Sequence, residues 1–262
     1  MASPKILVLG GYGINCEEET QFAFTTAGGI AEVKHVNDVI ENKNCLRDYQ
    51  ILALPGGFSF GDDTGSGKAL ANKLRNHLWE ELVSFINRGN LAIGICNGFQ
   101  VLANLGLLPA LDCKYGEQTV ALTHNTSARY ECRWVELVTG GSSVWTKGLG
   151  TFEVPVAHGE GRFVTRMMDR VKYQVIFRYA KQGAPARGEF PYNPNGSLDD
   201  VAGICDISGR VLGMMPHPER HIDFTQHYDW PARKEQLKRS GQPIPEEGPG
   251  LQIFRNGVKY FT

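Results

Sequence analysis

The chain has 262 residues, of which 42% are hydrophobic and 21% are charged, and these fractions are ordinary for a folded globular protein. Its 27 basic and 28 acidic residues leave a formal net charge of −1, so no overall field favours nucleic acid or an acidic membrane. Six cysteines are scattered without paired spacing, which argues against a disulfide framework and a structural zinc site. No window approaches the ~18 apolar residues of a membrane span, and the first residues lack a signal-peptide pattern. We therefore expect a cytoplasmic protein that binds neither nucleic acid nor membranes.

The first half of the chain alternates short apolar strands with amphipathic helices. The pattern predicts strands at 5–11, 31–36, 50–57 and 91–95 and helices at 17–29, 67–89 and 99–106. The longest helix carries one apolar stripe, formed by Leu70, Leu74, Leu78, Leu82, Phe85 and Ile86. Continuous apolar strands joined by helical crossovers predict an α/β fold with an open, mostly parallel sheet that is covered on both faces.

The second half changes character, because residues 118–190 are rich in β-branched and aromatic residues with little helical periodicity. We interpret them as an antiparallel β layer added to the same domain. An apolar strand follows at 210–216, and a helix is expected around 248–256. No linker rich in Pro, Gly or Ser separates these parts, so the pattern indicates one domain over residues 1–262.

Four unusual loops begin where an expected strand ends: GGYGINC, PGGFSFGDD, CNGFQ and HPERH. In open α/β sheets, ligands bind beyond the carboxyl ends of the strands. Because parallel strands bring these loops to one edge, we expect the functional site there.

Cys96 lies at the centre of a nucleophile-elbow pattern, Gly94-Ile95-Cys96-Asn97-Gly98, with sulfur in place of the serine oxygen. We expect a tight strand-to-helix turn that strains the backbone of Cys96 and lifts its thiol into solvent, with Gly94 and Gly98 avoiding Cβ clashes. The N-terminus of the following helix favours the reactive thiolate. A core cysteine beside a glycine-containing turn is the alternative.

A base for this nucleophile is available in the HPERH loop. In an extended segment His217 and Glu219 point the same way, and Pro218 favours that extended form. Glu219 then holds the imidazole while His217 takes the proton from Cys96. A surface loop is one alternative. The other is a metal site with three histidine ligands, His217, His221 and His227, but HExxH is absent and no further ligand cluster appears, so we expect no metal.

An oxyanion on an attacked carbonyl needs two backbone N–H donors aimed at one point. The N–H of Asn97 supplies one, and Gly57, at a strand end in the PGGFSFGDD loop, is our choice for the other. A simple turn at Gly56-Gly57 is the alternative. The stretch GDDTGSGKA at 61–69 has glycines of a phosphate loop, but their spacing is wrong and Ala69 cannot bind magnesium. We assign no nucleotide site to the chain.

GICNGFQ with a downstream HPE resembles the class I glutamine amidotransferases. That resemblance implies a flavodoxin-like α/β fold and a Cys-His-Glu triad that releases ammonia from glutamine. Five longer strings are similar to one branch of them, the glutaminase subunits of de novo purine biosynthesis: LPGGFSFGD, GICNGFQVLANLGLLP, PVAHGEGRF, VAGICD and GMMPHPER. Together these strings extend over nearly the whole chain.

Carried over residue by residue, the resemblance implies a role for each matching position. It makes Cys96 the nucleophile, His217 the general base and acid, and Glu219 the residue that orients the imidazole. The remaining positions are the oxyanion donors Gly57 and Asn97 and the glutamine-binding residues Gln100, Gly56 and Arg129.

The resemblance also implies partners. No cofactor is expected in this chain. ATP and magnesium are expected on a synthetase partner that converts formylglycinamide ribonucleotide to formylglycinamidine ribonucleotide, with a small accessory subunit as a further partner. Three alternatives stay open: a stand-alone γ-glutamyl cysteine hydrolase, an amidotransferase subunit of another pathway and a non-enzymatic interaction subunit. A stand-alone hydrolase would hydrolyse its substrate without a partner. A non-enzymatic interaction subunit would not be alkylated by reactive glutamine analogues.

Overall fold

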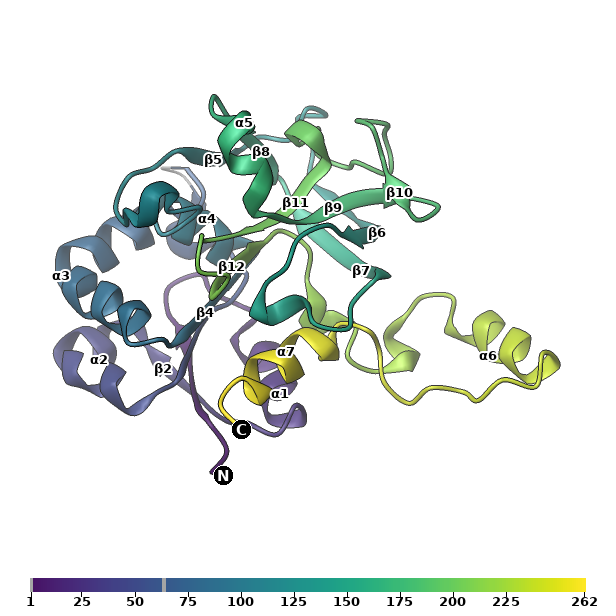
Figure 1. Ribbon diagram of the computed structural model, residues 1–262, viewed down its shortest axis with the longest axis horizontal. Helices are drawn as coiled ribbons and strands as arrows, with labels where there is room; N and C mark the ends of the chain where they lie inside the picture. The colour runs from purple at the N-terminus through teal and green to yellow at the C-terminus, as the bar shows by residue number, and fades with distance from the viewer. Residues whose placement is uncertain (1, 63–64) are drawn as a thin grey trace.

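The computed structural model describes residues 2–62 and 65–262, and in this part of the chain a ten-stranded mixed sheet runs through the molecule (Figure 1). Nine of its strands follow the order β2-β1-β3-β4-β12-β11-β9-β6-β7, and β10 pairs with β9. The strands are Lys5–Gly10 (β1), Ile30–His35 (β2), Ile51–Leu54 (β3), Leu91–Ile95 (β4), Val120–Thr123 (β5), Glu131–Thr139 (β6), Thr151–His158 (β7), Arg162–Thr165 (β8), Val175–Lys181 (β9), Ala184–Pro185 (β10), Val201–Cys205 (β11) and Val211–Met214 (β12). Asp63 and Thr64, which belong to the stretch rejected above as a phosphate loop, lie outside the described residues.

The parallel half of the sheet confirms the fold class predicted from the sequence. Strands β2, β1, β3, β4 and β12 all pair in parallel. Their spatial order is the 2-1-3-4-5 order of flavodoxin-like doubly wound sheets. The register aligns Leu54 with Gly94 and Ile95 with Met214, so β3, β4 and β12 end at nearly the same level. Three of the four loops singled out above therefore start side by side.

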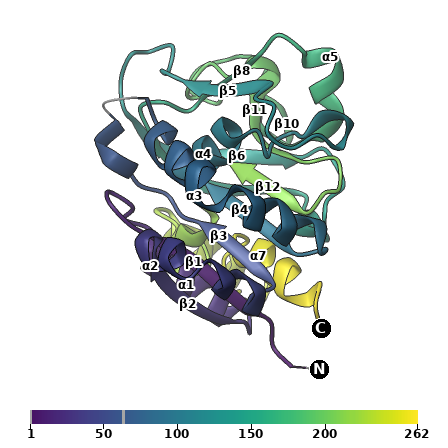
Figure 2. The same cartoon turned by 90° about the vertical axis from the view of Figure 1, so that its left-hand side faces the viewer.

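Helices cover both faces of the parallel half. The helices are Glu17–Thr26 (α1), Val36–Glu41 (α2), Lys68–Asn87 (α3), Asn97–Leu105 (α4), Met168–Val171 (α5), Trp230–Arg239 (α6) and Leu251–Lys259 (α7). Helices α3 and α4 lie side by side on one face, and α1 packs beside α7 on the other (Figures 1 and 2). The six stripe residues of α3 are all buried, because the apolar stripe is the face that α3 turns toward the sheet.

The antiparallel strands expected from the sequence are present, and most of them extend the main sheet beyond β12. Strand β11 pairs antiparallel with β12, and β9, β6 and β7 continue the same sheet beyond it. A separate two-stranded sheet is formed by β5 and β8. The physical reason is that β12 would otherwise end the parallel half with unpaired N–H and C=O groups, which β11 satisfies. Strand composition alone does not distinguish stacking from continuation.

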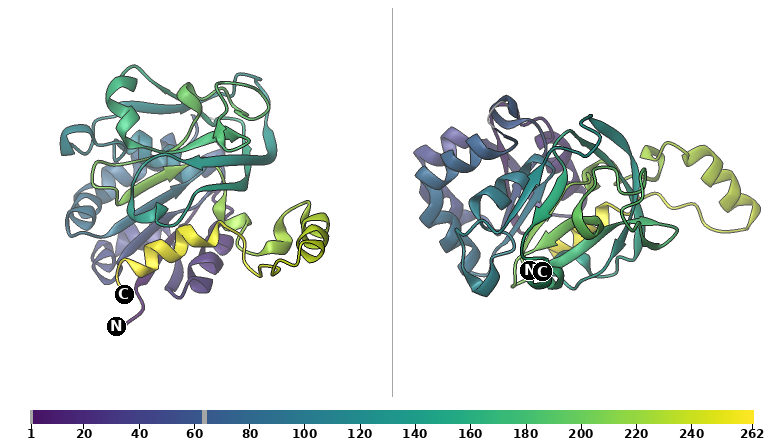
Figure 3. Two further views of the ribbon diagram at one scale, coloured as in Figure 1. Left: turned by 45° about the vertical axis from the view of Figure 1, so that its right-hand side comes forward. Right: turned by 90° about the horizontal axis from the view of Figure 1, so that it is seen from above.

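The C-terminal part adds a projecting arm, residues 223–247. It contains α6, on which no residue is buried, and it extends away from the body of the molecule (Figures 1 and 3). The chain then returns to α7, which begins at Leu251, three residues later than the start expected from the sequence. Among residues 2–62 and 65–262, we find no helix whose length and apolar character suffice to cross a bilayer.

Gly98, on the first turn of α4, is predicted to be essential for stability. A Cβ at this position would lie 1.9 Å from the carbonyl oxygen of Leu54, so Gly98→Ala must push α4 away from β3. We expect the free energy of unfolding to fall by about 3 kcal/mol, measured by urea denaturation. Gly150→Ala is the control, because a Cβ there meets no atom within 4 Å. Equal midpoints for the two variants would show that α4 does not approach β3 this closely.

Candidate active site

Cys96 occupies the predicted elbow between β4 and α4. Its backbone has φ 51° and ψ −107°, a conformation that is rare for a residue with a side chain. The N–H of Cys96 donates to the carbonyl of Met214 at the end of β12, which fixes the turn to the neighbouring strand. A Cβ on Gly94 would lie 2.5 Å from the carbonyl oxygen of Gly98. The two glycines therefore permit the strained turn, as the sequence predicted.

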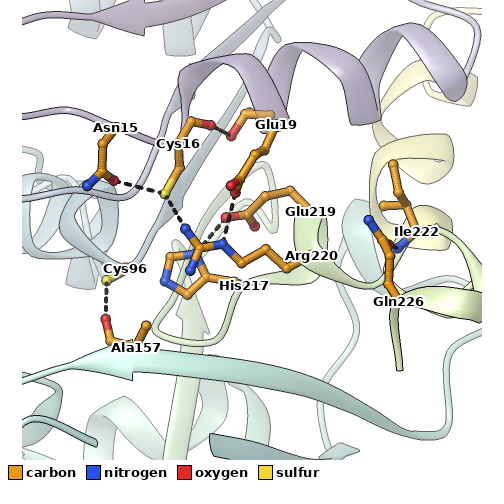
Figure 4. Close-up of polar contacts among 11 residues, drawn as sticks. Asn15, Cys16, Glu19, Cys96, Ala157, His217, Glu219, Arg220, Ile222 and Gln226 are labelled. Carbon is orange, nitrogen blue, oxygen red and sulfur yellow. Dashed lines mark hydrogen bonds and ion pairs between the residues drawn. The ribbon is translucent and has the colours of Figure 1, made fainter. Parts of the chain in front are cut away.

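The expectation that the turn lifts the Cys96 thiol into solvent is wrong, because the residue is only 5% exposed. Its thiol donates a hydrogen bond of 3.7 Å to the carbonyl of Ala157 near the end of β7. The antiparallel half of the sheet thus brings a strand end over the elbow, an arrangement that local sequence cannot predict. Cys96 belongs to the buried hydrophobic cluster, and its side chain faces the His217 imidazole (Figure 4).

His217 and Glu219 form a buried pair immediately after β12. The Nδ1 of His217 lies 2.6 Å from the Oε1 of Glu219, and the two side chains are 2% and 0% exposed. The Pro218–Arg220 segment makes a single 3-10 turn, and the N–H of His217 donates to the carbonyl of Pro155 on β7. The hydrogen bond to Pro155 and the contact with Glu219 together hold the imidazole in one orientation.

The charges around His217 favour its protonated form. Burial pulls its pKa down, but the carboxylate of Glu219 and the neighbouring Cys96 outweigh burial and raise the pKa well above its ordinary value. Within residues 2–62 and 65–262, the Nε2 of His217 finds no hydrogen-bond partner although it is buried. The imidazole is thus oriented through Nδ1, and its Nε2 remains without a partner among the described residues.

The Gly56-Gly57 turn, which follows β3, presents a free backbone N–H donor at the carboxyl edge of the sheet. Gly57 forms an isolated antiparallel β-bridge with Ile14. The backbone N–H of Phe58 donates to the carbonyl of Gly13, and that of Asn15 donates to the carbonyl of Gly56, so Gly57 lies at a non-hydrogen-bonded position of the bridge. Its φ is +147°, and a Cβ would lie 2.5 Å from the Gly13 oxygen, so only glycine fits. In the described part of the chain, the N–H groups of Gly57 and Asn97 donate to no other residue.

Gly56 lies where Cys96 and His217 approach each other. A Cβ on Gly56 would lie 2.7 Å from the Cε1 of His217, 3.4 Å from the Cβ of Cys96 and 3.1 Å from the Sγ of Cys16. Four segments of the chain, which carry Cys16, Gly56, Cys96 and His217, therefore meet here. Any larger side chain at position 56 would fill that space.

Gln100 lies one helical turn after Cys96 and is 4% exposed. Its Oε1 accepts from the side chain of Asn97, and its Nε2 donates to the carbonyl of Glu160.

Arg129 lies in an exposed turn before β6, and its side chain makes no hydrogen bond or ion pair with the described residues. The structure thus places Gln100, but not Arg129, in direct contact with residues of the elbow.

The alternative interpretation, in which His217, His221 and His227 together bind a metal ion, is wrong. The Nδ1 of His221 contacts the carbonyl of Glu153, and the ring of His227 packs 4.4 Å from that of Trp134. Among the described residues, the potential ligand cluster is a different one, formed by Cys16, His217 and Glu219. Cys16 was missed from the sequence, although it ends GGYGINC, one of the four loops that follow strands.

A strained cysteine elbow facing a His-Glu pair, at the carboxyl edge of a flavodoxin-like sheet, is the arrangement that the resemblance to class I glutamine amidotransferases implied. Residues 3–261 match the family model described as a CobB/CobQ-like glutamine amidotransferase domain, and the chain belongs to this family. The family predicted from the sequence is thereby confirmed.

Named relatives place the chain within the family. It is 51% identical over 266 residues to "Phosphoribosylformylglycinamidine synthase subunit PurQ" of Methanococcus maripaludis strain S2, with 99% of this chain and 98% of the relative covered. The same subunit of Dehalococcoides mccartyi is 43% identical, again with 99% and 98% covered. A chain from a solved structure of PurLQS from Thermotoga maritima superposes with a TM-score of 0.74 at 29% identity, with all of both chains covered.

Proposed function

We propose that this chain is the glutaminase subunit of phosphoribosylformylglycinamidine synthase. It hydrolyses glutamine to glutamate and ammonia, and a synthetase partner uses the ammonia to convert formylglycinamide ribonucleotide to formylglycinamidine ribonucleotide in de novo purine biosynthesis. The observation that carries the proposal is the Cys96 thiol at a strained elbow, beside an imidazole whose Nδ1 is held by Glu219 at 2.6 Å. The similarity to PurQ subunits over 99% of the chain supports the choice of synthase.

In the proposed mechanism the Cys96 thiolate attacks the side-chain amide carbon of glutamine. The tetrahedral oxyanion accepts hydrogen bonds from the N–H groups of Gly57 and Asn97. His217 gives its proton to the departing nitrogen, so ammonia leaves and a γ-glutamyl thioester remains on Cys96. Water then gives a proton to His217 and its oxygen to the carbonyl carbon, which releases glutamate and regenerates the thiolate. Glu219 stabilises the imidazolium whenever His217 carries the proton.

The remaining site residues are proposed to bind glutamine. Gln100 projects from the first turns of α4 beside the nucleophile, and Gly56 leaves space between Cys96 and His217 for the substrate carboxamide. Arg129 is proposed as an outer contact to glutamine, because its exposed guanidinium remains available to a carboxylate. Within this proposal residues 1–262 act as one glutaminase domain.

Gly57→Ala should impair catalysis more than binding. Because φ at this position is +147° and a Cβ would meet the Gly13 carbonyl, alanine must rotate the turn and move the N–H donor. We expect kcat to fall by about 100- to 1,000-fold, with a much smaller change in KM for glutamine. Initial-rate measurements of glutamate release test this. An unchanged kcat would remove Gly57 from the oxyanion site.

Partners and cofactors follow from the same proposal. No chemistry assigned to the site residues needs a cofactor, so ATP and magnesium belong to the synthetase partner. One of the relatives is a chain of PurLQS, which supports a synthetase subunit and a small accessory subunit as partners. The chain is proposed to act in the cytoplasm, where purine precursors are made.

The proposal is tested by combining the chain with its synthetase partner, ATP, magnesium and formylglycinamide ribonucleotide. We expect glutamine to support formation of formylglycinamidine ribonucleotide, whereas the synthetase without this chain should need added ammonium. A stand-alone γ-glutamyl hydrolase would instead release glutamate at full rate without a partner and would transfer no nitrogen. That second result would contradict the proposal.

A further inference from the structure

A cluster of buried polar side chains lies at the end of β7 and has no role in the mechanism above. Its members come from three separate parts of the chain and are at most 4% exposed: Asn125, His158, Asn195 and Ser197. Burying polar groups costs free energy unless their hydrogen bonds are made, so such a cluster constrains the groups that it contacts. Here it contacts the turn between β7 and β8, residues 159–161.

Asn125 holds one side of this turn. Its Nδ2 donates to the carbonyl of His158 at 2.8 Å, and its Oδ1 accepts from the N–H of Gly161 at 3.0 Å. Its own backbone N–H donates to the carbonyl of Gly159 at 2.9 Å. Asn125 thus binds backbone groups on both sides of Glu160. The turn cannot shift without breaking several of these bonds together.

Asn195 holds the other side of the turn. Its Nδ2 donates to the carbonyl of Gly161 at 2.9 Å and to the hydroxyl of Tyr179 at 3.0 Å. Its Oδ1 accepts from the backbone N–H of Ser197 at 3.0 Å and from the Ser197 hydroxyl at 2.7 Å. Both backbone groups of Gly161 are therefore bound, the N–H by Asn125 and the carbonyl by Asn195.

The imidazole of His158 lies between the two asparagines. Its Nδ1 is 3.2 Å from the Oδ1 of Asn125, and its Nε2 is 3.4 Å from the Nδ2 of Asn195. Because an amide oxygen can only accept, the Nδ1 of His158 carries the proton and its Nε2 accepts. Burial lowers the pKa of His158 to about 3, which keeps the ring in this neutral form. A Cβ on Gly161 would lie 2.5 Å from the Nδ1 of His158, so the ring packs directly on the turn.

The turn reaches the proposed glutamine site through the carbonyl of Glu160. That carbonyl accepts from the Nε2 of Gln100 at 2.6 Å, and the Oε1 of Gln100 accepts from Asn97 at 2.9 Å. The two bonds fix which way the Gln100 amide faces, and they leave one N–H and one oxygen lone pair of that amide for glutamine. The side chain of Glu160 makes longer contacts, 3.4 Å to the N–H of Ser66 and 3.7 Å to His124.

We propose that Asn125 and Asn195 are positioning residues for glutamine binding. They fix the turn at 159–161, so that the carbonyl of Glu160 holds the Gln100 amide in the orientation that glutamine requires. Asparagine suits both positions because each amide donates to one backbone group and accepts from another. The inference rests on the function proposed above and adds these residues to its binding site.

The thiol of Cys96 does not depend on this turn. Its acceptor, the carbonyl of Ala157, belongs to β7, where Ala157 pairs with Cys132 of β6. The strand pairing therefore keeps the nucleophile in place when the turn moves. Loss of either asparagine should weaken glutamine binding much more than it slows the chemical step.

The test measures glutamate release by the chain assembled with its synthetase partner and compares Asn195→Ala with Asn256→Ala. Asn256 is the matched control, because it is 5% exposed and donates to two backbone carbonyls, those of Trp145 and Lys147, from α7. In Asn195→Ala we expect KM for glutamine to rise about tenfold and kcat to stay within about threefold, since a lost hydrogen bond to a ligand costs about this factor. Asn256→Ala should lower the urea midpoint and leave KM unchanged.

A double-mutant cycle tests whether Asn195 acts through Gln100. Gln100→Ala should raise KM by itself, and adding Asn195→Ala should raise KM little further, because the positioned group is already gone. Effects on KM that multiply would overturn the proposal. An unchanged KM in Asn195→Ala would also overturn it, as would a fall in kcat alone, which is what a smaller folded fraction produces. If circular dichroism shows that Asn195→Ala is unfolded, Asn195→Ser replaces it, with the same expected rise in KM.

A separate measurement distinguishes this inference from the proposed function. If the unchanged chain in the assembled synthase releases no glutamate, the proposed function is contradicted. Calorimetric titration of the same assembly with glutamine then tests the positioning directly, and the dissociation constant should rise about tenfold in Asn195→Ala. Absence of glutamine binding by the unchanged chain would overturn both.

Discussion

Replacing Cys96 with alanine should abolish glutamine hydrolysis. Without the sulfur no thioester forms, and water would have to attack an unactivated amide, so we expect glutamate release to fall by about 10⁴-fold or more. Alanine removes one atom and keeps the Cβ, so the elbow backbone should persist and glutamine should still bind. Glutamate release measures the first effect, and calorimetric titration with glutamine measures the second.

The matched control for this variant is Cys132→Ala, because Cys132 lies on β6 and is exposed. It should hydrolyse glutamine at the unchanged rate. Equal activity in Cys96→Ala and Cys132→Ala would end the assignment of Cys96 as nucleophile. Loss of glutamine binding together with activity in Cys96→Ala would show that the cysteine shapes the pocket as well as reacting in it.

Replacing Glu219 with glutamine should cost almost as much activity as removing the nucleophile. The substitution keeps the shape of the side chain, but a neutral amide cannot stabilise the imidazolium and can favour the wrong tautomer of His217. The distance of 2.6 Å and the complete burial of the pair make this charge effective. We expect kcat to fall by about 10³- to 10⁴-fold, measured as glutamate release at saturating glutamine.

The same variant should shift the pH profile. Glu219 contributes to raising the pKa of His217 above its ordinary value, so the protonated imidazole persists to higher pH in the unchanged chain. Removing the carboxylate charge lowers that pKa, and the alkaline limb of kcat/KM must therefore move to lower pH. Glu153→Gln is the control, since this carboxylate lies near His227 instead. An alkaline limb at the same pH in Glu219→Gln would contradict the coupling between the two residues.

The local features of the site were predictable from sequence because they depend on residues close together in the chain. Gly94 and Gly98 flank Cys96 at the spacing that an elbow needs, and the structure shows the positive φ that this spacing implies. His217 and Glu219 are two residues apart and meet as expected. That β1 to β4 and β12 run parallel followed from apolar strands that alternate with helices.

Features that depend on distant segments were not predictable. The burial of Cys96 comes from β7, which reaches the elbow only because the antiparallel strands continue the main sheet. Cys16 is 80 positions from Cys96, and no ligand-spacing rule connects the two cysteines. It approaches the site because β1 and β3 are neighbours in the sheet, which brings the loop after β1 against Gly56. Such contacts follow from topology, which a single sequence specifies only indirectly.

The most direct test of the central claim is to react the chain with a glutamine analogue that carries an alkylating diazoketone or chloroketone in place of the side-chain amide. Peptide mapping by mass spectrometry then locates the covalent label. If Cys96 is the nucleophile in a glutamine-binding site, one label per chain should appear, on Cys96 alone among the six cysteines, and glutamine should protect against it. A label on another cysteine, or a folded chain that takes no label, would contradict the account.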